Sequence, residues 1–469
     1  MSAAERFEQY MEHLAAGLGH MDRRAGLRGY CTGLMLPLER KSVEPMAASV
    51  DPLRASARHQ ALHHFVAKAD WSDEEMLRRV AQCVVPRMDL SAGAFWIVDD
   101  TGFPKKGEHS VGVARQYCGQ LGKQDNCQVA VSVSLATEAA SIPVAYRLYL
   151  PKSWALDHAR RRKAAVPSSV RFATKGQIAL AQIEELLAAG AAAHCVLADA
   201  AYGTETAFRL RLSELGLPYM VGVVSSVSVW PPGVEPLPPK PYSGRGRPPL
   251  MPQRSPRRQP VSVKALAQSL PADAFQRLSW REGSNAQLSG RFAAVRVRHA
   301  GGNGGRARLW PSQWLLIEWP NDEPEPTKYW LSTLAEDTAL NDLVAAAHMR
   351  WRIERDYLEL KQELGLGHYE GRSWRGFHHH ASLSIAAYGF LVAEQLTAGK
   401  RSGIKKNFIQ LQVPALPSGY LARGSPARTT TRAKLHRDPA PSTQRSPGRP
   451  RTSLPVLRSR KRKIQLVTQ

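Results

Sequence analysis

Two apolar runs that end abruptly in aspartate constrain the fold of this chain most. "AFWIVDD" (94–100) and "HCVLADAAYG" (194–203) each predict a buried strand with an acid at its carboxyl end. An unpaired carboxylate is costly there, so a cation or a charged neighbour is expected beside it. Taken singly, each aspartate is equally consistent with a turn or a helix cap. Because strand residues alternate sides, only one of Asp99 and Asp100 should share a pocket with Asp199, and the period leaves open which one.

The segments around these runs predict a mixed α/β sheet. "QVAVSVSLA" (128–136) alternates in hydrophobicity and "IPVAYRLYL" (142–150) follows it, so these two runs and 94–100 predict an antiparallel meander. Helical patterns then alternate with strands: "GQIALAQIEELLAAG" (176–190) precedes the second aspartate strand, and a further helix leads into "PYMVGVV" (218–224).

The chain divides by composition into five parts. Residues 1–88 predict short helices, including one that Ser72 and Glu75 should cap, and we expect either a DNA-end-binding domain or a bundle that only packs. The rest comprises the first part of the sheet core (89–225), a basic proline-rich loop followed by a β-rich insertion (226–337), helices that complete the core (338–399) and a basic, disordered tail (400–469).

Net charge indicates a polyanionic partner. The chain has 64 Lys+Arg and 40 Asp+Glu, a formal charge of +24, which favours nucleic acid over an acidic membrane surface. Residues 401–469 hold 16 of these bases and one acid, Asp438, and therefore 15 of the 24 net charges. Five widely spaced cysteines and the lack of a long apolar run predict a protein of a reducing cytosol, neither secreted nor membrane-spanning.

A late charged helix offers a third acid. In "RWRIERDYLELK" (350–361), Arg350, Glu354 and Lys361 fall on one helix face, which is also the pattern of an ordinary solvated stripe. The nearby run "FHHH" (377–380) invites a metal-site interpretation, but adjacent helical residues point about 100 degrees apart, so surface or packing histidines are expected.

Together, "IVDDTGFPKKG", "VLADAAYGTE" and "RWRIERDYLELKQELGLGHYEGRSW" resemble the three catalytic blocks of DDE transposases encoded by bacterial insertion sequences. The similarity extends in order over about 1–397 and is closest to the group whose third block reads Y-x2-R-x3-E-x6-K. Arg350, Glu354 and Lys361 match that spacing, whereas Ala347 occupies the tyrosine position. The resemblance implies an RNase H-like core with a β-rich insertion between the second Asp and the Glu. It implies metal ligands at Asp100, Asp199 and Glu354, with Asp99 as the alternative to Asp100.

The resemblance also implies a reaction. Mg2+, with Mn2+ as a substitute, would support nicking at terminal inverted repeats and attack of the freed 3′-hydroxyl on target DNA. Arg350 and Lys361 would bind phosphates beside the metal, and a homodimer on double-stranded DNA is expected in the bacterial cytoplasm, at the nucleoid. The alternative is a catalytically inactive DNA-binding repressor derived from a transposase.

Further DNA contacts are predicted outside the three blocks. Lys105 and Lys106 follow the first acid block and are expected near phosphate. "GRGRPP" (244–249) contains the Arg-Gly-Arg-Pro core of an AT-hook, so Arg245 and Arg247 are predicted to enter a minor groove, although such tripeptides also occur in solvated basic loops.

Overall fold

The computed structural model describes most of the chain up to residue 402. The described residues are 1–91, 93–234, 237, 240–246, 259–282, 287–300 and 310–402. Residues 403–469 of the predicted tail and 16 residues of the basic loop, Arg247 among them, therefore lie outside the described residues, while 400–402 belong to a helix. All described residues belong to one compact unit, 1–417.

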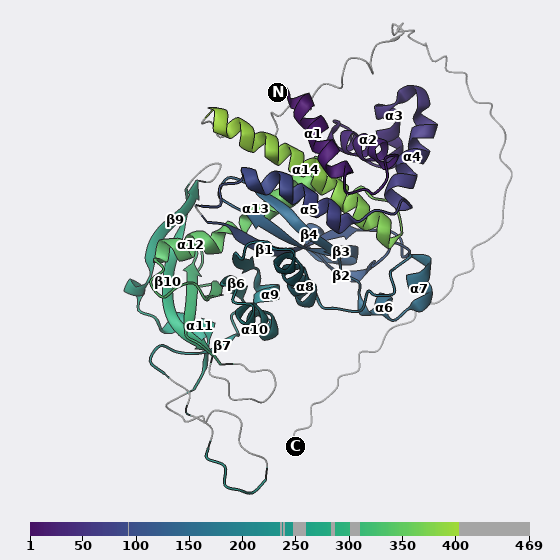
Figure 1. The fold of residues 1–469 in the computed structure, drawn as a ribbon. Coiled ribbons are helices and arrows are strands. Elements are labelled where there is room, and N and C mark those ends of the chain that lie inside the picture. The colour runs from purple at the N-terminus through teal and green to yellow at the C-terminus, as the bar shows by residue number, and fades with distance from the viewer. Residues whose placement is uncertain are drawn as a thin grey trace, which may run out of the picture. The chain divides into compact units, whose positions relative to one another are not determined.

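A twelve-stranded sheet forms the centre of the described structure (Figure 1). Its main path runs β2-β3-β1-β5-β6-β12-β11-β10-β7-β8, with β4 paired to β3 and β9 paired to β10. The strands of the core are β1 (Phe95–Pro104), β2 (Ala114–Cys118), β3 (Lys123–Ala136), β4 (Ser141–Leu148), β5 (Cys195–Ala198) and β6 (Tyr219–Val223).

The core has the mixed connectivity that the sequence predicts. β1, β3 and β4 pair antiparallel, whereas β1, β5 and β6 pair parallel. This mixed α/β sheet confirms the expected RNase H-like fold class. Ser132 and Ser134 of β3 are as buried as the valines between them, so helices cover both faces of the sheet. β2 was not predicted, because "ARQYC" has no continuous apolar run.

Helices lie on both sides of the sheet (Figure 1). The helices of the core are α8 (Lys175–Ala188), which precedes β5, α9 (Ala200–Gly203) and α10 (Thr206–Glu214), which lie between β5 and β6, and α12 (Leu340–Met349) and α13 (Trp351–Gln362), which follow the insertion. Two short helices, α6 (Lys152–Ala155) and α7 (His158–Lys163), fill the connection from β4 to α8.

The N-terminal helices pack around the long helix α14 (Trp374–Ser402). They are α1 (Ala3–Ala15), α2 (Arg23–Met35), α3 (Val43–Val50), α4 (Ala55–Ala67) and α5 (Asp73–Val84). Arg6 pairs with Glu394 at 2.5 Å, and the Tyr10 hydroxyl donates to the carbonyl of Ala386. The Ser72 hydroxyl accepts from the Glu75 amide at 3.0 Å, which confirms the predicted cap of α5. The helical prediction for 1–88 is thus confirmed, while its DNA binding stays a prediction.

The insertion is β-rich, as predicted. It contains β9 (Gln276–Glu282), β10 (Gln287–His299), β11 (Gln313–Trp319), β12 (Lys328–Ser332) and α11 (Val263–Ser269). The prediction of an exposed loop over 226–262 needs correction at both ends, where β7 (Ser228–Trp230) pairs with β8 (Val261–Ser262). Val229 is fully buried there, so tertiary packing recruits these ends into the sheet.

Candidate active site

The two aspartate strands meet at the same edge of the sheet. β1 and β5 are parallel neighbours, and Val98 and Ala198 are their last paired residues. Asp99 and Asp199 directly follow this pair, so they lie side by side. Buried apolar side chains fix both strands up to this point, since Ile97, Val98, Leu197 and Ala198 are at most 2% exposed. The fold thus brings together acids that are 100 positions apart in the sequence.

Asp99 faces helix α13. It lies directly opposite Ser132 on the antiparallel strand β3, and directly opposed residues in such a pair point to the same face. The Ser132 hydroxyl is hydrogen-bonded to the hydroxyl of Tyr357 on α13, at 2.5 Å. Since α13 covers this face of the sheet, Asp99 and Glu354 lie on the same side of the core.

Arg350 joins these two carboxylates. Its Nη1 donates to Oδ2 of Asp99 at 3.0 Å and its Nη2 donates to Oε1 of Glu354 at 2.9 Å. The Asp99 side chain is 16% exposed and that of Glu354 is 66% exposed, so the bridge runs from the protein interior to solvent. The charged stripe is therefore not an ordinary solvated face: Arg350, the N-cap of α13, links Glu354 of that helix to Asp99 in the middle of β1.

Asp100 points to the opposite face, towards α8. Its Oδ2 accepts from the Lys175 ammonium at 2.9 Å and from the Tyr202 hydroxyl at 3.2 Å. The predicted set of Asp100, Asp199 and Glu354 is therefore split by the strand, because Glu354 shares its side with Asp99. The geometry favours the alternative that the strand period left open.

Asp199 caps helix α9. Its Oδ1 accepts from the backbone amides of Ala201 and Tyr202, at 2.9 and 3.3 Å, so the capping role predicted as an alternative is present. Oδ2 makes no hydrogen bond with any residue that the structure describes. Gly203 lets α9 lie close against β6, since a Cβ at this position would collide with the carbonyl oxygen of Gly222. One oxygen of Asp199 thus fixes the carboxylate, and the other remains free.

The surroundings of Asp99 disfavour the charged form of its carboxyl group. The pKa of Asp99 is raised to about 7, chiefly by burial; the Arg350 guanidinium opposes the rise, and the charges of Asp199 and Asp100 contribute to it. Carboxylate oxygens are ligands of Mg2+, so Asp99, Asp199 and Glu354 fit a hard divalent cation in kind. Within the described ranges no group of three or more His, Cys, Asp or Glu side chains is already arranged to hold a metal, and the Arg350 guanidinium stands between two of these acids.

Two lysines predicted to contact phosphate are engaged by protein groups instead. The Lys361 ammonium donates to the carbonyl of Gly102 at 2.9 Å and to Oε1 of Gln120 at 3.3 Å, and burial lowers its pKa to about 8. The Lys105 ammonium donates to the carbonyl of Tyr369 at 2.7 Å, and burial lowers its pKa too. Both lysines hold parts of the core together, and a phosphate contact would require them to exchange these partners.

Lys106 and Arg245 remain available. Both side chains are exposed, and neither forms an ion pair with another described residue. Of the predicted AT-hook, Arg245 is described and Arg247 is not. The DNA contacts assigned to these residues stay predictions.

Ala347, at the tyrosine position of the third block, is buried in the structure. It lies on α12 and is 7% exposed, packed in the main core. Among the aromatic side chains near the acids, Tyr202 donates to Asp100 and Tyr357 bonds to Ser132. The sequence analysis did not single out Tyr202, Tyr357 or Lys175. The only available signals were their positions in the sequence. Tyr202 follows the Asp199 strand, Tyr357 lies on the same helix as Glu354, and Lys175 begins a helix.

Comparison with known proteins agrees with the resemblance drawn from the sequence. A curated relative is a probable transposase for insertion sequence element IS701 from Microchaete diplosiphon, 31% identical over 195 residues. That alignment covers 41% of this chain and 47% of the relative, so the chain spans about half the length of the curated relative it matches. Residues 13–287 match the family model of the DDE superfamily endonucleases, a range that includes both aspartate strands but not Glu354. Since this match extends over more than half of the 469 residues, the chain belongs to the DDE superfamily endonucleases.

Proposed function

We propose that the protein is a DNA transposase that nicks DNA at transposon terminal inverted repeats and joins the freed 3′-hydroxyl ends to target DNA. The observation that carries this proposal is the placement of Asp99 beside Asp199 on neighbouring parallel strands, with Arg350 linking Asp99 to Glu354. Membership of the DDE endonucleases and the similarity to a transposase support it. The positive charge of the chain fits a DNA substrate.

Asp99, Asp199 and Glu354 would hold Mg2+, or Mn2+ in its place. When bound, the ions would supply positive charge to the scissile phosphate and to the attacking and leaving oxygens of an in-line displacement. Asp99 takes the place that the sequence analysis gave to Asp100. Asp100 instead positions Lys175 and Tyr202 on the opposite face.

Arg350 would bind the two carboxylates in the free protein and a DNA phosphate in the complex. Its guanidinium balances Asp99 and Glu354 in the structure, where it donates to both. A bound phosphate offers the same paired acceptors, and arginine binds it through the same two-pronged geometry. The arginine would therefore pass from the two carboxylates to the scissile strand as the acids take up metal.

Single substitutions of the four acids test the assignment. Asp99→Asn, Asp199→Asn and Glu354→Gln should each reduce Mg2+- or Mn2+-dependent nicking of terminal-repeat DNA by about 10³-fold or more, because each removes a charged ligand. Asp100→Asn is the matched control on the same strand and should cost less than about 10-fold. Nicking is measured on supercoiled DNA that carries the repeats, with DNA binding measured in parallel.

The same assay separates the alternatives. Nicking unchanged in Asp99→Asn but abolished in Asp100→Asn would restore the original assignment. Repeat binding by the native protein with no cleavage in either metal would favour the inactive repressor. Cleavage without strand transfer would indicate a nuclease that only cuts. Because the joining reaction brings two repeat ends together, we also expect a dimer on the paired ends.

A further inference from the structure

The connection from β4 to α8 forms a basic arm, which we define as residues 152–175. It contains seven lysines and arginines and one acid, Asp157, so it has a formal charge of +6 over 24 residues. Lys152, Arg162, Lys163 and Arg171 are exposed. None of the three catalytic blocks includes this segment, and its function is not accounted for by the acids alone.

Buried contacts give the arm a fixed shape. Arg161 is 8% exposed, and its guanidinium donates to the carbonyls of Ala155, Pro167 and Val170 at 3.2, 2.9 and 2.7 Å. The Trp154 indole donates to the carbonyl of Val113 at 2.7 Å. A buried arginine satisfied by carbonyls holds the two ends of the arm together, so its exposed cations stand on a built scaffold.

The exposed cations of the arm have no acidic partner among the described residues, whereas many other surface cations do. Elsewhere Arg24 pairs with Glu12, Arg28 with Glu8, and Arg211 with Glu184. Lys152, Arg162, Lys163 and Arg171 form no ion pair with any residue in the described part of the chain. Clustered like charges repel one another, so such a patch is best explained by an external anion.

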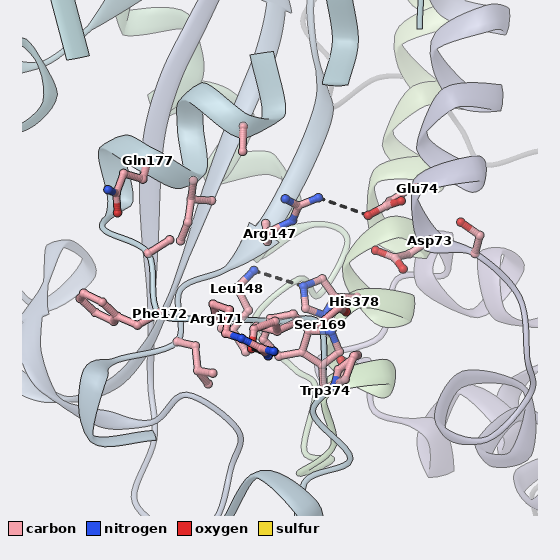
Figure 2. Close-up of a pocket in the computed structure, with 17 residues that line it drawn as sticks. Asp73, Glu74, Arg147, Leu148, Ser169, Arg171, Phe172, Gln177, Trp374 and His378 are labelled. Atoms are coloured by element: carbon pink, nitrogen blue, oxygen red, sulfur yellow. Dashed lines mark hydrogen bonds and ion pairs between the residues drawn. The ribbon is translucent and has the colours of Figure 1, made fainter. Parts of the chain in front are cut away.

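The inner side of the arm does not provide that anion site. A pocket of about 540 Å³ lies between the arm and the rest of the core, lined by Arg171, Arg147, Asp73 and Glu74 among others (Figure 2). Arg147 is already paired with Glu74 at 3.2 Å and with Glu185 at 2.9 Å. The two acids of α5 would repel an anion there, so the candidate surface is the outer side of the arm, which we define by the exposed residues Lys152, Arg162 and Lys163 outside this pocket.

The arm ends at the strand that carries the acids, on the face of the sheet opposite Asp99 and Glu354. Its last residue, Lys175, begins α8 and places its ammonium 2.9 Å from Oδ2 of Asp100. Its other side reaches the β1–β2 loop, where Arg160 donates to the carbonyl of Glu108 at 3.0 Å, two residues from the exposed Lys106. The unpaired cations therefore lie on the segment that leads directly to the strand of catalytic acids.

We propose that the outer side of the basic arm binds the phosphate backbone of double-stranded DNA as the duplex approaches the acids. The inference rests on the proposed function for the identity of the polyanion. It assigns the arm a sequence-independent role, because lysines and arginines on phosphates position a duplex without reading its bases.

A charge-matched pair of full-length variants tests this proposal. Lys152→Gln/Arg162→Gln/Lys163→Gln removes three unpaired arm cations that do not line the pocket. Lys123→Gln/Arg211→Gln/Lys264→Gln removes three surface cations that pair with Asp125, Glu184 and Glu325. Binding of a short duplex of arbitrary sequence is measured by fluorescence anisotropy without divalent metal, over a range of salt concentrations.

The arm variant should bind about 10-fold more weakly than the native protein, and its salt dependence should fall by about two to three units of slope, close to 0.9 per lost phosphate contact. The control should change the slope by less than about one unit. Equal slopes in the arm variant and the native protein, or equal losses in both variants, would overturn the proposal. So would an arm variant that loses binding to phosphatidylglycerol vesicles but keeps DNA binding.

A second measurement on the native protein removes any dependence on variant folding. Bound duplex should protect Lys152 and Lys163 from acetylation, read by mass spectrometry, and unprotected arm lysines in a saturated complex would overturn the proposal. These binding readouts need neither metal nor cleavage. A native protein that binds through the arm yet never nicks would therefore refute the proposed function and leave the arm assignment standing.

Discussion

Helices α13 and α14 both contain runs of polar residues that invite a functional interpretation, and the structure gives them opposite roles. On α13, Arg350 and Glu354 project from the core and meet the acid of β1. On α14, His378, His379 and His380 are at most 5% exposed. The difference comes from what surrounds each helix: α13 covers one edge of the sheet, whereas the N-terminal helices pack around α14.

The α14 histidines are structural because every one finds partners inside the core. His378 accepts from the Leu148 amide at 3.2 Å, and its other ring nitrogen contacts the carbonyl of Trp374 at 2.9 Å. His380 bonds to the Tyr30 hydroxyl and to the carbonyl of Gly365, both at 2.9 Å. A polar run therefore indicates function only when its groups are not already satisfied by the fold.

The largest expected effect concerns the α13 side of this comparison. Arg350→Gln should lower the rate of DNA nicking by about 10²–10³-fold, since it removes a charged donor beside the scissile phosphate. Its free energy of unfolding should fall by about 1–3 kcal/mol, because the mostly buried Asp99 loses its charged donor, so nicking is measured per folded molecule. Arg355→Gln, on the same helix and paired with Glu359, is the control and should cut normally.

The α14 side should respond in the opposite way. His380→Ala should lower the free energy of unfolding by about 3 kcal/mol, because it leaves a cavity and the buried partners Tyr30 and Gly365 unsatisfied. Urea denaturation measures this loss, and nicking per folded molecule should stay normal at low temperature. Normal stability with lost nicking would reverse the roles given to the two helices.

The pH dependence of stability sharpens the same contrast. Burial lowers the pKa of His380 to about 4, below its ordinary value of 6.5. The unfolded chain therefore binds the proton first as the pH falls, and stability that is fully present above about pH 6.5 is lost towards pH 4. By pH ~5 this histidine should account for about 2 kcal/mol. Urea midpoints of the native protein and of His380→Gln should converge as the pH is lowered.

The smallest expected effect separates two members of the α13 stripe. Lys361→Met should cost about 1 kcal/mol of stability, because its ammonium donates to Gly102 and Gln120 and lies 5.1 Å from the centroid of the Phe103 ring. Nicking should fall far less than in Arg350→Gln. A loss of nicking as large as that of Arg350→Gln, at unchanged stability, would show that Lys361 contacts DNA directly.

Much of the fold was predictable because it depends on local patterns. The apolar runs of β1 and β5, the alternation of β3 and the cap of α5 each carry their own signal. β7 and β8 were not predictable, since only pairing with distant β10 recruits them. The candidate site was predictable down to the choice between Asp99 and Asp100. That choice depends on which face α13 covers, and the contact between Ser132 and Tyr357 that reveals it joins residues 225 positions apart.

The bridge from Asp99 to Arg350 joins positions that are 251 residues apart, and this has a consequence for protein synthesis. A ribosome makes the aspartate strands and the basic arm long before it makes α13. A nascent or prematurely terminated chain therefore contains the proposed duplex-binding segment without the third acid. Such products would occupy DNA without cutting it, so full translation itself delays the appearance of a competent nuclease.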